Sequence, residues 1–273
     1  MKIICLIRPE PQFIYFVNRI HEEHGVSLAV VETVPALDRL RTKLKRQGLA
    51  GVWQSSINRA RNRARAARFA RDCRRHFGDR SGALDGSVPN VQCRDINAKD
   101  ILARLEAEKP DLILDHGTSI VDDALLQTAD LALNLHWGLS PYYRGTNCTD
   151  WALINWDPHN IGVTIHKLSR VIDGGSILAQ ARASIEPDDN VDSINMKLTC
   201  LGTDLVLSAI RRLERGEQLS FAAQQHSLGY LGTSGQWSTA LRAHVAWLER
   251  SGAIAQMLKS PARRSKLPIV ELD

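Results

Sequence analysis

Residues 131–145 read LALNLHWGLSPYYRG, and the interpretation of the whole chain starts from this stretch. Residues 131–135 are apolar apart from Asn134, which predicts a short buried strand, and His136 follows at once. Because side chains alternate along a strand with a period of two, Asn134 and His136 are expected to point to the same side. The stretch therefore predicts two polar side chains lying together at the end of a buried strand.

A loop follows this strand, and Gly138, Pro141 and Gly145 punctuate it. These residues stop the strand and delay any helix until about Thr146. In open α/β sheets, ligands lie beyond the carboxyl ends of strands, where loops on a rigid scaffold carry function. Taken alone, the polar pair is equally compatible with a ligand site and with a structural histidine at a strand end.

A second candidate element covers residues 161–180, IGVTIHKLSRVIDGGSILAQ. Residues 162–168 alternate and contain several β-branched residues, which predicts a strand, and residues 176–181 begin another. Asp173 lies in the loop between them, directly before two glycines. This pattern is typical of a hairpin turn, and the alternative is a carboxylate presented to a site.

The beginning of the chain predicts a β-α-β unit, with strands over residues 2–8 and 26–32 and a helix over residues 12–23. Such a unit favours an α/β fold with a doubly wound, mostly parallel sheet. The turn after the first strand reads RPEP, so it lacks the glycine-rich phosphate cradle of dinucleotide-binding folds. We therefore do not expect a bound NAD.

Hydrophobic periodicity and capping residues predict the remaining elements. Ser119 is the expected cap of a helix that begins near it, and Asn190 or Asp192 caps a long amphipathic helix. The expected strands cover residues 88–96 and 111–115, and the expected helices cover residues 98–109, 146–155, 191–216 and 238–251.

Composition narrows the class of protein. No apolar run in the 273 residues approaches the length that crosses a membrane, and the initial MKIICLI is too short for the apolar region of a secretory signal. We therefore expect a cytoplasmic location. The five cysteines are scattered without C-x-x-C spacing, so neither a disulfide framework nor a metal site is predicted.

Residues 35–80 are interpreted as an insert with an unusual charge. Between residues 39 and 75 there are thirteen Lys and Arg residues and one acid, Asp72, whereas the whole chain has a net charge of +5. The rest of the chain is therefore net negative. A local cationic surface of this kind suits RNA (a tRNA among them), an anionic membrane or a polyanionic substrate.

Residues 57–75 of this insert predict a helix with a narrow packing seam at Ala60, Ala64 and Ala67 and with arginines on most other faces. Trp53, just before the helix, is a candidate anchor for the segment. The alternative to a binding surface is a solvated helix that tolerates arginine. Because this alanine seam is narrow, we expect the helix to bury little surface against the rest of the chain in either case.

The motifs together resemble the 10-formyltetrahydrofolate-dependent formyltransferases, which include glycinamide ribonucleotide, methionyl-tRNA and nucleotide-sugar formyltransferases. The resemblance is dense over residues 110–180 and weak elsewhere, and it rests on four segments: Asn134-x-His136, Ser140-Pro141-x-Tyr143-Arg144-Gly145, Gly162-Val163-Thr164-Ile165 and Asp173-x-Gly175. It implies a Rossmann-like formyltransferase fold with 10-formyltetrahydrofolate as co-substrate. The resemblance is a strong indication of the family and a weak indication of which amine accepts the formyl group.

The chemistry explains the three polar residues of the motif. Formyl transfer to an amine passes through a tetrahedral species with a negative oxygen, and aimed donors stabilise it by a few kcal/mol. Asn134 and His136 are the expected donors. His136 also suits the proton transfer from the amine to the folate nitrogen, because it titrates near neutrality. By resemblance, Asp173 orients the imidazole and favours its charged form.

The resemblance also implies binding roles for two loops and a set of acceptor contacts. The expected folate contacts are His116, Gly117, Thr118, Ser119 and Ile120 after one strand, with Arg170, Val171 and Ile172 covering the pterin. The expected acceptor contacts are Arg8, Ser140, Tyr143, Arg144, Gly145 and Thr146. Arg8 is the candidate that replaces the family's glycine-containing phosphate turn, and the alternative is a solvated surface arginine. His116 is a second candidate acid or base, a role that the family pattern does not give it.

We expect a catalytic domain over residues 1–216, with the basic helical insert at 35–80, and a short C-terminal extension over residues 217–273. Methionyl-tRNA formyltransferases carry a C-terminal barrel of about a hundred residues, for which this extension is too short. The leading hypothesis is therefore formylation of a nucleotide-linked amino sugar, by a monomer or a homodimer. The alternatives are a reduced methionyl-tRNA formyltransferase and a non-catalytic RNA-binding protein on this fold.

Overall fold

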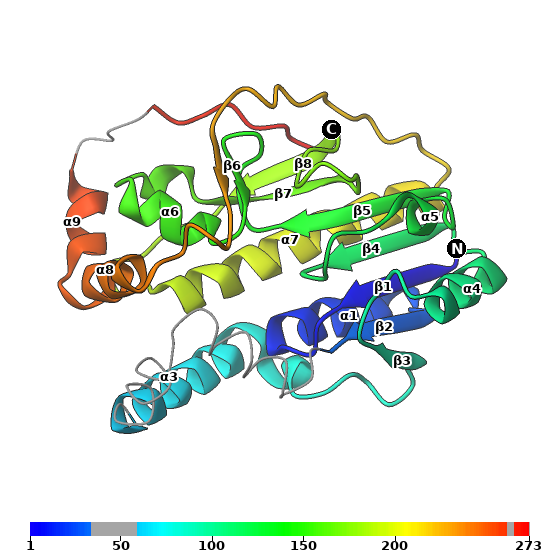
Figure 1. Ribbon diagram of the computed structural model, residues 1–273, viewed down its shortest axis with the longest axis horizontal. Helices are drawn as coiled ribbons and strands as arrows, with labels where there is room; N and C mark the ends of the chain where they lie inside the picture. The colour runs from blue at the N-terminus through cyan, green and yellow to red at the C-terminus, as the bar shows by residue number, and fades with distance from the viewer. Residues whose placement is uncertain (34–58, 261–264, 273) are drawn as a thin grey trace.

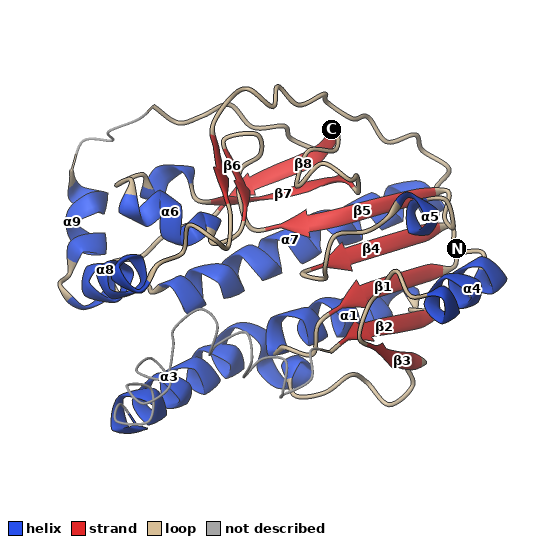
Figure 2. Ribbon diagram, in the orientation of Figure 1, coloured by secondary structure: helices blue, strands red, loops and turns tan. Residues whose placement is uncertain are grey.

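The computed structural model describes residues 1–33, 59–260 and 265–272. Within them, one sheet is parallel from β3 to β5 and antiparallel at β5–β7 and β7–β8. Its strands, in spatial order, are β3 (Asn90–Cys93), β2 (Leu28–Glu32), β1 (Ile3–Ile7), β4 (Leu112–His116), β5 (Leu131–His136), β7 (Gly162–Lys167) and β8 (Ile177–Arg182). The expected α/β fold with a mostly parallel, doubly wound sheet is confirmed (Figure 2).

Helices cover both faces of this sheet. α1 (Pro11–His24) and α7 (Val191–Glu214) belong to one core, and α4 (Lys99–Glu108) and α5 (Asp123–Leu126) belong to the other. Alternation along β1 explains the division, because Ile3, Cys5 and Ile7 join the first core while Ile4 and Leu6 join the second. A strand buried on both faces is continuously apolar, as β1 is.

The remaining helices are α3 (Arg59–Phe77), α6 (Cys148–Ile154), α8 (Thr239–Arg250) and α9 (Ala253–Lys259), with short 3₁₀ turns at Gly78–Ser81 and Pro158–Asn160. Figure 1 shows α6, α8 and α9 grouped beyond the end of the sheet toward which the arrowhead of β5 points. At the start of α7, Asn190 accepts hydrogen bonds from the backbone N–H groups of Asp192 and Ser193. The expected Asn190 cap is therefore confirmed.

The segment after Gly216 packs against the rest of the chain. Its strand β9 (Tyr230–Gly232) pairs in parallel with β6 (Tyr143–Gly145), and Val245 and Leu248 of α8 join the larger core. The backbone of Val270 exchanges hydrogen bonds with Gln180 on β8. The strand β6 was not expected, because only its partner from a distant part of the sequence makes it a strand. The division at residue 216 stays a prediction.

The helix predicted in the basic insert is present as α3, but the predicted alanine seam is wrong. Ala64 and Ala67 are exposed, and the side that packs against α1 and α7 instead contains Phe69, Cys73 and Phe77. Larger apolar side chains bury more surface than alanine, so they decide which face turns inward. The side chain of Ala60, and Trp53 with the basic residues 39–58, lie outside what is described.

The expected helix cap at Ser119 is also wrong. α5 begins later, at Asp123, and the helix after the Gly145 loop likewise begins at Cys148 rather than Thr146. Ser119 instead donates to the Glu32 carboxylate, through its hydroxyl at 2.5 Å and its backbone N–H at 2.9 Å. A buried carboxylate at the end of β2, which β1 separates from β4 in the sheet, thus holds the loop after β4.

Candidate active site

A cavity of about 660 Å³ opens at the carboxyl ends of β1, β4 and β5. The arrowheads of these three strands point to the same end of the sheet in Figure 1. The predicted site residues that line the cavity are Arg8, His116, Gly117, Thr118, Ser119, Ile120, Asn134, His136, Gly145, Thr146, Arg170, Ile172 and Asp173. The fold therefore brings together segments that are far apart in the sequence.

Four of the predicted site residues lie outside the cavity lining. Ser140 is fully buried, and its carbonyl accepts a hydrogen bond from Gln180 Nε2 at 2.7 Å. Tyr143 and Arg144 are buried as well, and the Arg144 guanidinium donates to the carbonyl of His226. Val171 is exposed beside the cavity. In this arrangement Ser140, Tyr143 and Arg144 hold the loop in place.

The center of the cavity is a quartet formed by Asn134 and His136 on β5, His166 on β7 and Asp173. Asp173 lies between the two imidazoles, with Oδ2 3.4 Å from His136 Nδ1 and Oδ1 3.6 Å from His166 Nε2. Asn134 Nδ2 lies 3.0 Å from the same His166 nitrogen. Asn134 and His136 do point to one side of the strand, as alternation predicts.

The local backbone explains why Asp173 reaches the histidines. Its φ of +46° lies in the left-handed region, which aspartate tolerates better than most residues. The carboxylate also accepts a hydrogen bond from the backbone N–H of Gly145 at 2.6 Å. The turn expected between β7 and β8 is thus also the segment that delivers a carboxylate to the site.

The Asp173 carboxylate is the negatively charged group of the quartet. Burial acts to raise its pKa, but the imidazoles of His136 and His166 and the Gly145 N–H outweigh burial and bring the pKa of Asp173 to about 2. Asp173 is therefore ionised at neutral pH, next to two groups that can accept protons. An ionised carboxylate favours the charged form of a neighbouring imidazole.

His136 is placed between hydrogen-bond acceptors. Its Nε2 lies 3.0 Å from the carbonyl oxygen of Tyr143, and its Nδ1 faces Asp173. A neutral imidazole donates from one nitrogen only, so both acceptors are satisfied only by the imidazolium. Burial lowers the pKa of His136 while Asp173 acts to raise it. The ring is therefore neutral near pH 7, with acceptors in place to stabilise it once it takes a proton.

Two neighbouring residues lie close against the His136 imidazole. A Cβ on Gly138 would lie 2.4 Å from His136 Nε2, so glycine at this position leaves room for the imidazole. The Cys148 sulfur lies 3.6 Å from the same nitrogen, and burial raises the pKa of this thiol well above its usual range. Cys148 is therefore a packed neutral thiol and not a nucleophile.

The side of the cavity formed by the loop after β4 offers an apolar surface. Ile120 is 60% exposed, and Ile172, on the loop after β7, is 41% exposed. Phe13 and Trp137 stack at 5.7 Å between ring centroids, and His116 packs edge-on against both. Exposed apolar side chains beside a cavity are typical of a ligand surface. This surface fits a flat heteroaromatic ring such as the pterin of a folate.

Two further acids line the cavity, buried Asp115 and half-buried Asp150. Burial raises the pKa of Asp115 to about 7, against the hydroxyl of Thr118, which donates to it. On the opposite side, burial followed by the charges of Glu249 and Asp192 raises the pKa of Asp150 to about 7. Asp150 lies in the first turn of α6 and lines the cavity. Both acids therefore titrate near neutrality.

Sequence reasoning missed His166, Asp150 and Trp137. The signal for His166 was a polar residue two positions after Thr164 in an apolar strand, which places both on one side of β7. For Asp150 and Trp137 no local pattern exists, because their place at the cavity follows from how α6 and the Gly138 loop pack. His116 is buried among aromatic rings, and burial lowers its pKa to about 3, so it stays uncharged near neutrality.

Within the described residues, no group of three or more His, Cys, Asp or Glu side chains could hold a metal ion. Among the described helices, none is long and apolar enough to cross a membrane.

The sequence is similar to a known protein family and to a curated protein. The sequence model of the family described as formyl transferase matches residues 1–210. The methionyl-tRNA formyltransferase of Chlorobium chlorochromatii (strain CaD3) is 31% identical over 150 residues, which are 55% of this chain and 47% of that protein. The chain thus spans about half the length of this curated relative.

Solved structures share the fold. A sugar N-formyltransferase from Shewanella sp. FDAARGOS_354 superposes with a TM-score of 0.55 at 15% identity, over 91% of this chain and 87% of that chain. HypX from Aquifex aeolicus, in complex with tetrahydrofolic acid, superposes with a TM-score of 0.54 at 17% identity, over 89% of this chain and 31% of that chain. At these identities the likeness concerns the fold alone.

Proposed function

The chain belongs to the formyl transferase family, and we propose that it transfers a formyl group from 10-formyltetrahydrofolate to the amino group of a nucleotide-linked amino sugar. The observation that carries this proposal is the meeting of Asn134, His136 and Asp173 in one cavity at the carboxyl edge of the sheet. Donors, an acid/base group and an ionised carboxylate within a few ångströms are what amide-forming transfer requires.

The residues present fit a folate. The loop of residues 116–120 borders the cavity with backbone and small polar groups, and Ile120 and Ile172 leave apolar surface uncovered. The folate supplies an activated formyl group when bound. Ile120 and Ile172 would bind the pterin ring, and Asn134 would donate to the formyl oxygen as negative charge develops on it.

His136 would move the proton. The attacking amine loses a proton as its nitrogen bonds to the formyl carbon, and the folate nitrogen gains one as its bond to that carbon breaks. A buried neutral imidazole next to ionised Asp173 can accept the first proton and supply the second, directly or through a water. Asp173 would stabilise the imidazolium and keep its orientation, and it need not be protonated itself.

The acceptor side supports a small, hydroxylated amine. Thr146, Thr149, Asp150 and Asn195 line it with hydroxyl, amide and carboxylate groups. Such groups suit the hydroxyls and amine of a sugar. Arg8, at the end of β1, is the lining cation nearest in sequence to the turn that holds phosphate in related enzymes, and it would face the nucleotide part.

A second candidate is formylation of an initiator tRNA. The specific observation in its favour is α3, along which Arg63, Arg65, Arg68, Arg71, Arg74 and Arg75 are all exposed. The curated relative from Chlorobium is named a methionyl-tRNA formyltransferase. A non-catalytic RNA-binding protein is disfavoured, because it would have no use for the acid/base group and its carboxylate.

The test is an acceptor panel. Purified protein with 10-formyltetrahydrofolate is incubated with nucleotide-linked amino sugars in parallel with methionyl-tRNA, and release of tetrahydrofolate is followed. Release with one amino sugar supports the proposal. Release only with charged tRNA supports the second candidate and overturns the first, and folate binding with no release for any acceptor counts against both.

A further inference from the structure

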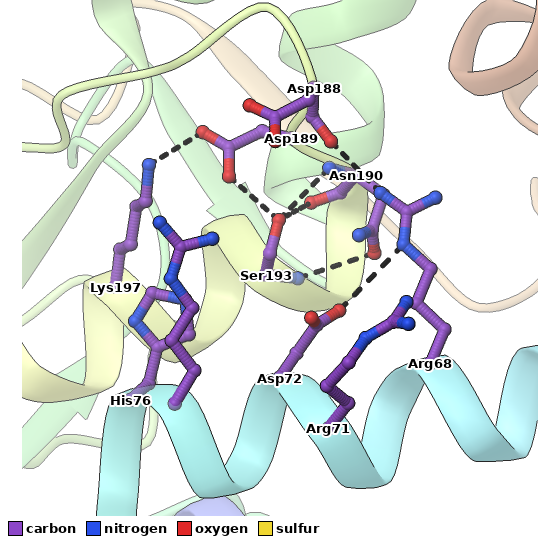
Figure 3. A pocket seen from close by; sticks show the side chains of 10 residues that line it. Arg68, Arg71, Asp72, His76, Asp188, Asp189, Asn190, Ser193 and Lys197 are labelled. Carbon is purple, nitrogen blue, oxygen red and sulfur yellow. Dashed lines mark hydrogen bonds and ion pairs between the residues drawn. The ribbon is translucent and has the colours of Figure 1, made fainter.

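A second cavity, of about 290 Å³, lies between α3 and the beginning of α7 (Figure 3). It shares no lining residue with the catalytic cavity. Cations from one face of α3 meet polar and acidic groups from residues 188–197 across it. The proposed formyl transfer uses none of these groups, so the cavity needs a separate explanation.

Part of the charge in this cavity is already neutralised. Lys197 Nζ lies 2.7 Å from Asp189 Oδ2, and Arg68 Nε lies 3.8 Å from Asp72 Oδ2. Arg68 also donates to the carbonyl of Asp188 at 2.9 Å. Figure 3 shows these pairs on either side of the opening. These contacts pair the charges of Lys197, Asp189, Arg68 and Asp72 with one another.

Among the described residues, two lining arginines and the carboxylate of Asp188 are left without an ion pair. Arg71 and Arg75 lie one turn apart on α3 and line the cavity, and neither forms an ion pair with a residue that the structure describes. Burial, followed by the charges of Lys197 and Arg75, lowers the pKa of His76. His76 is therefore neutral near pH 7, and the two arginines outnumber the one unpaired carboxylate, that of Asp188.

The side chain of Asn190 is an independent indication that a hydrogen-bond acceptor binds in this cavity. Its side chain is only 5% exposed, and its Oδ1 caps α7 by accepting from the N–H groups of Asp192 and Ser193. Asn190 lines the same cavity, and its buried Nδ2 has no hydrogen-bond partner among the described residues. Buried donors without a partner are rare in folded proteins, so an acceptor is expected here.

We propose that this cavity binds a small phosphate-bearing anion. Arg71 and Arg75 would contact its oxygens with their planar, multiply donating guanidinium groups, and Asn190 Nδ2 would donate one further hydrogen bond. A bound anion would tie the basic helix α3 to the start of α7. Asp72 and Asp189 are already paired with Arg68 and Lys197, and the cavity of about 290 Å³ has room for a small anion only, so a compact phosphate is favoured over RNA.

The experiment is a calorimetric titration of the whole protein with inorganic phosphate and with pyrophosphate, at constant ionic strength. Saturable binding at one site per chain is expected. Arg71→Gln should weaken it about tenfold, because a charge-assisted hydrogen bond is lost. Arg74→Gln is the matched control, with the same charge change on an exposed residue of the same helix outside the cavity lining, and it should leave binding nearly unchanged.

Asn190→Asp is the sharper variant. Aspartate caps a helix as well as asparagine does, so α7 and the thermal midpoint should be preserved, while the unpartnered donor becomes an acceptor that repels an anion. Phosphate binding should again fall about tenfold or more. The proposal is overturned by unsaturable heats, by unchanged binding in Asn190→Asp, or by equal losses in Arg71→Gln and Arg74→Gln. Displacement of phosphate by a short RNA with such equal losses would identify a diffuse nucleic-acid surface instead.

Discussion

Asn134 Nδ2 lies 3.0 Å from His166 Nε2, and the two residues are register partners on the antiparallel strands β5 and β7. His166 Nδ1 lies 2.8 Å from the carbonyl of Lys167, which assigns the donor role to Nδ1 and the acceptor role to Nε2 in the neutral ring. One N–H of the Asn134 amide is therefore held by His166. The proposed mechanism uses the other N–H for the formyl oxygen.

This relationship predicts that His166 acts through Asn134. His166→Ala should lower kcat about tenfold and leave the KM for folate little changed, because a positioned oxyanion donor becomes mobile. In a double-mutant cycle with Asn134→Ala, the second substitution should cost almost nothing further, with a coupling energy of about 1–2 kcal/mol. Steady-state kinetics of the four proteins measure it. Additive losses would show that His166 has only a structural role.

His136→Ala should lower turnover about a hundredfold or more, because the group that transfers the proton is removed. Affinity for folate, measured by fluorescence titration, should remain close to that of the wild type. His244→Ala, on the exposed surface of α8, serves as the control. Wild-type turnover in the His136 variant would remove it from the mechanism.

Asp173→Asn should change the pH dependence of kcat/KM. The Asp173 carboxylate raises the pKa of His136 against the stronger effect of burial, so its removal should lower that pKa further. The acidic limb of the profile, where His136 becomes protonated, should then move to lower pH. Asp79→Asn makes the same change at an exposed residue outside the cavity lining and should leave this limb in place. An identical limb in Asp173→Asn and wild type would contradict the assignment.

Ile172→Ser should weaken folate binding about tenfold, because a partly exposed apolar side chain that the pterin would cover is lost. Leu228→Ser is the matched control, since Leu228 is also 41% exposed and lies outside the cavity lining. Equilibrium binding of the folate measures both variants. Equal affinities in the two would place the pterin elsewhere.

Much of the fold could be predicted from local sequence patterns. The apolar runs of β1, β4 and β5 and the periodicity of α7 are properties of neighbouring residues, and so is the Asn190 cap. The same holds for the shared direction of Asn134 and His136, which needs only the alternation of a strand. The roles of these residues in catalysis stay predictions.

Contacts between distant segments could not be predicted in this way. The strand β6 exists because β9 pairs with it, and Ser119 leaves its expected cap because Glu32, on another strand, accepts its hydrogen bonds. The packing face of α3 was predicted wrongly, because the spacing of alanines does not reveal which larger side chains contact α1 and α7.

The sequence by itself determined the class of fold, the strands of the large sheet and the polar pair at the end of β5, because these depend on patterns within a few residues. Only the tertiary structure decided that Asp173 lies between two imidazoles, that His166 holds Asn134, and that Asn190 faces Arg71 and Arg75 across a cavity. Such relationships depend on strand register and helix packing, which join residues that the chain itself keeps far apart.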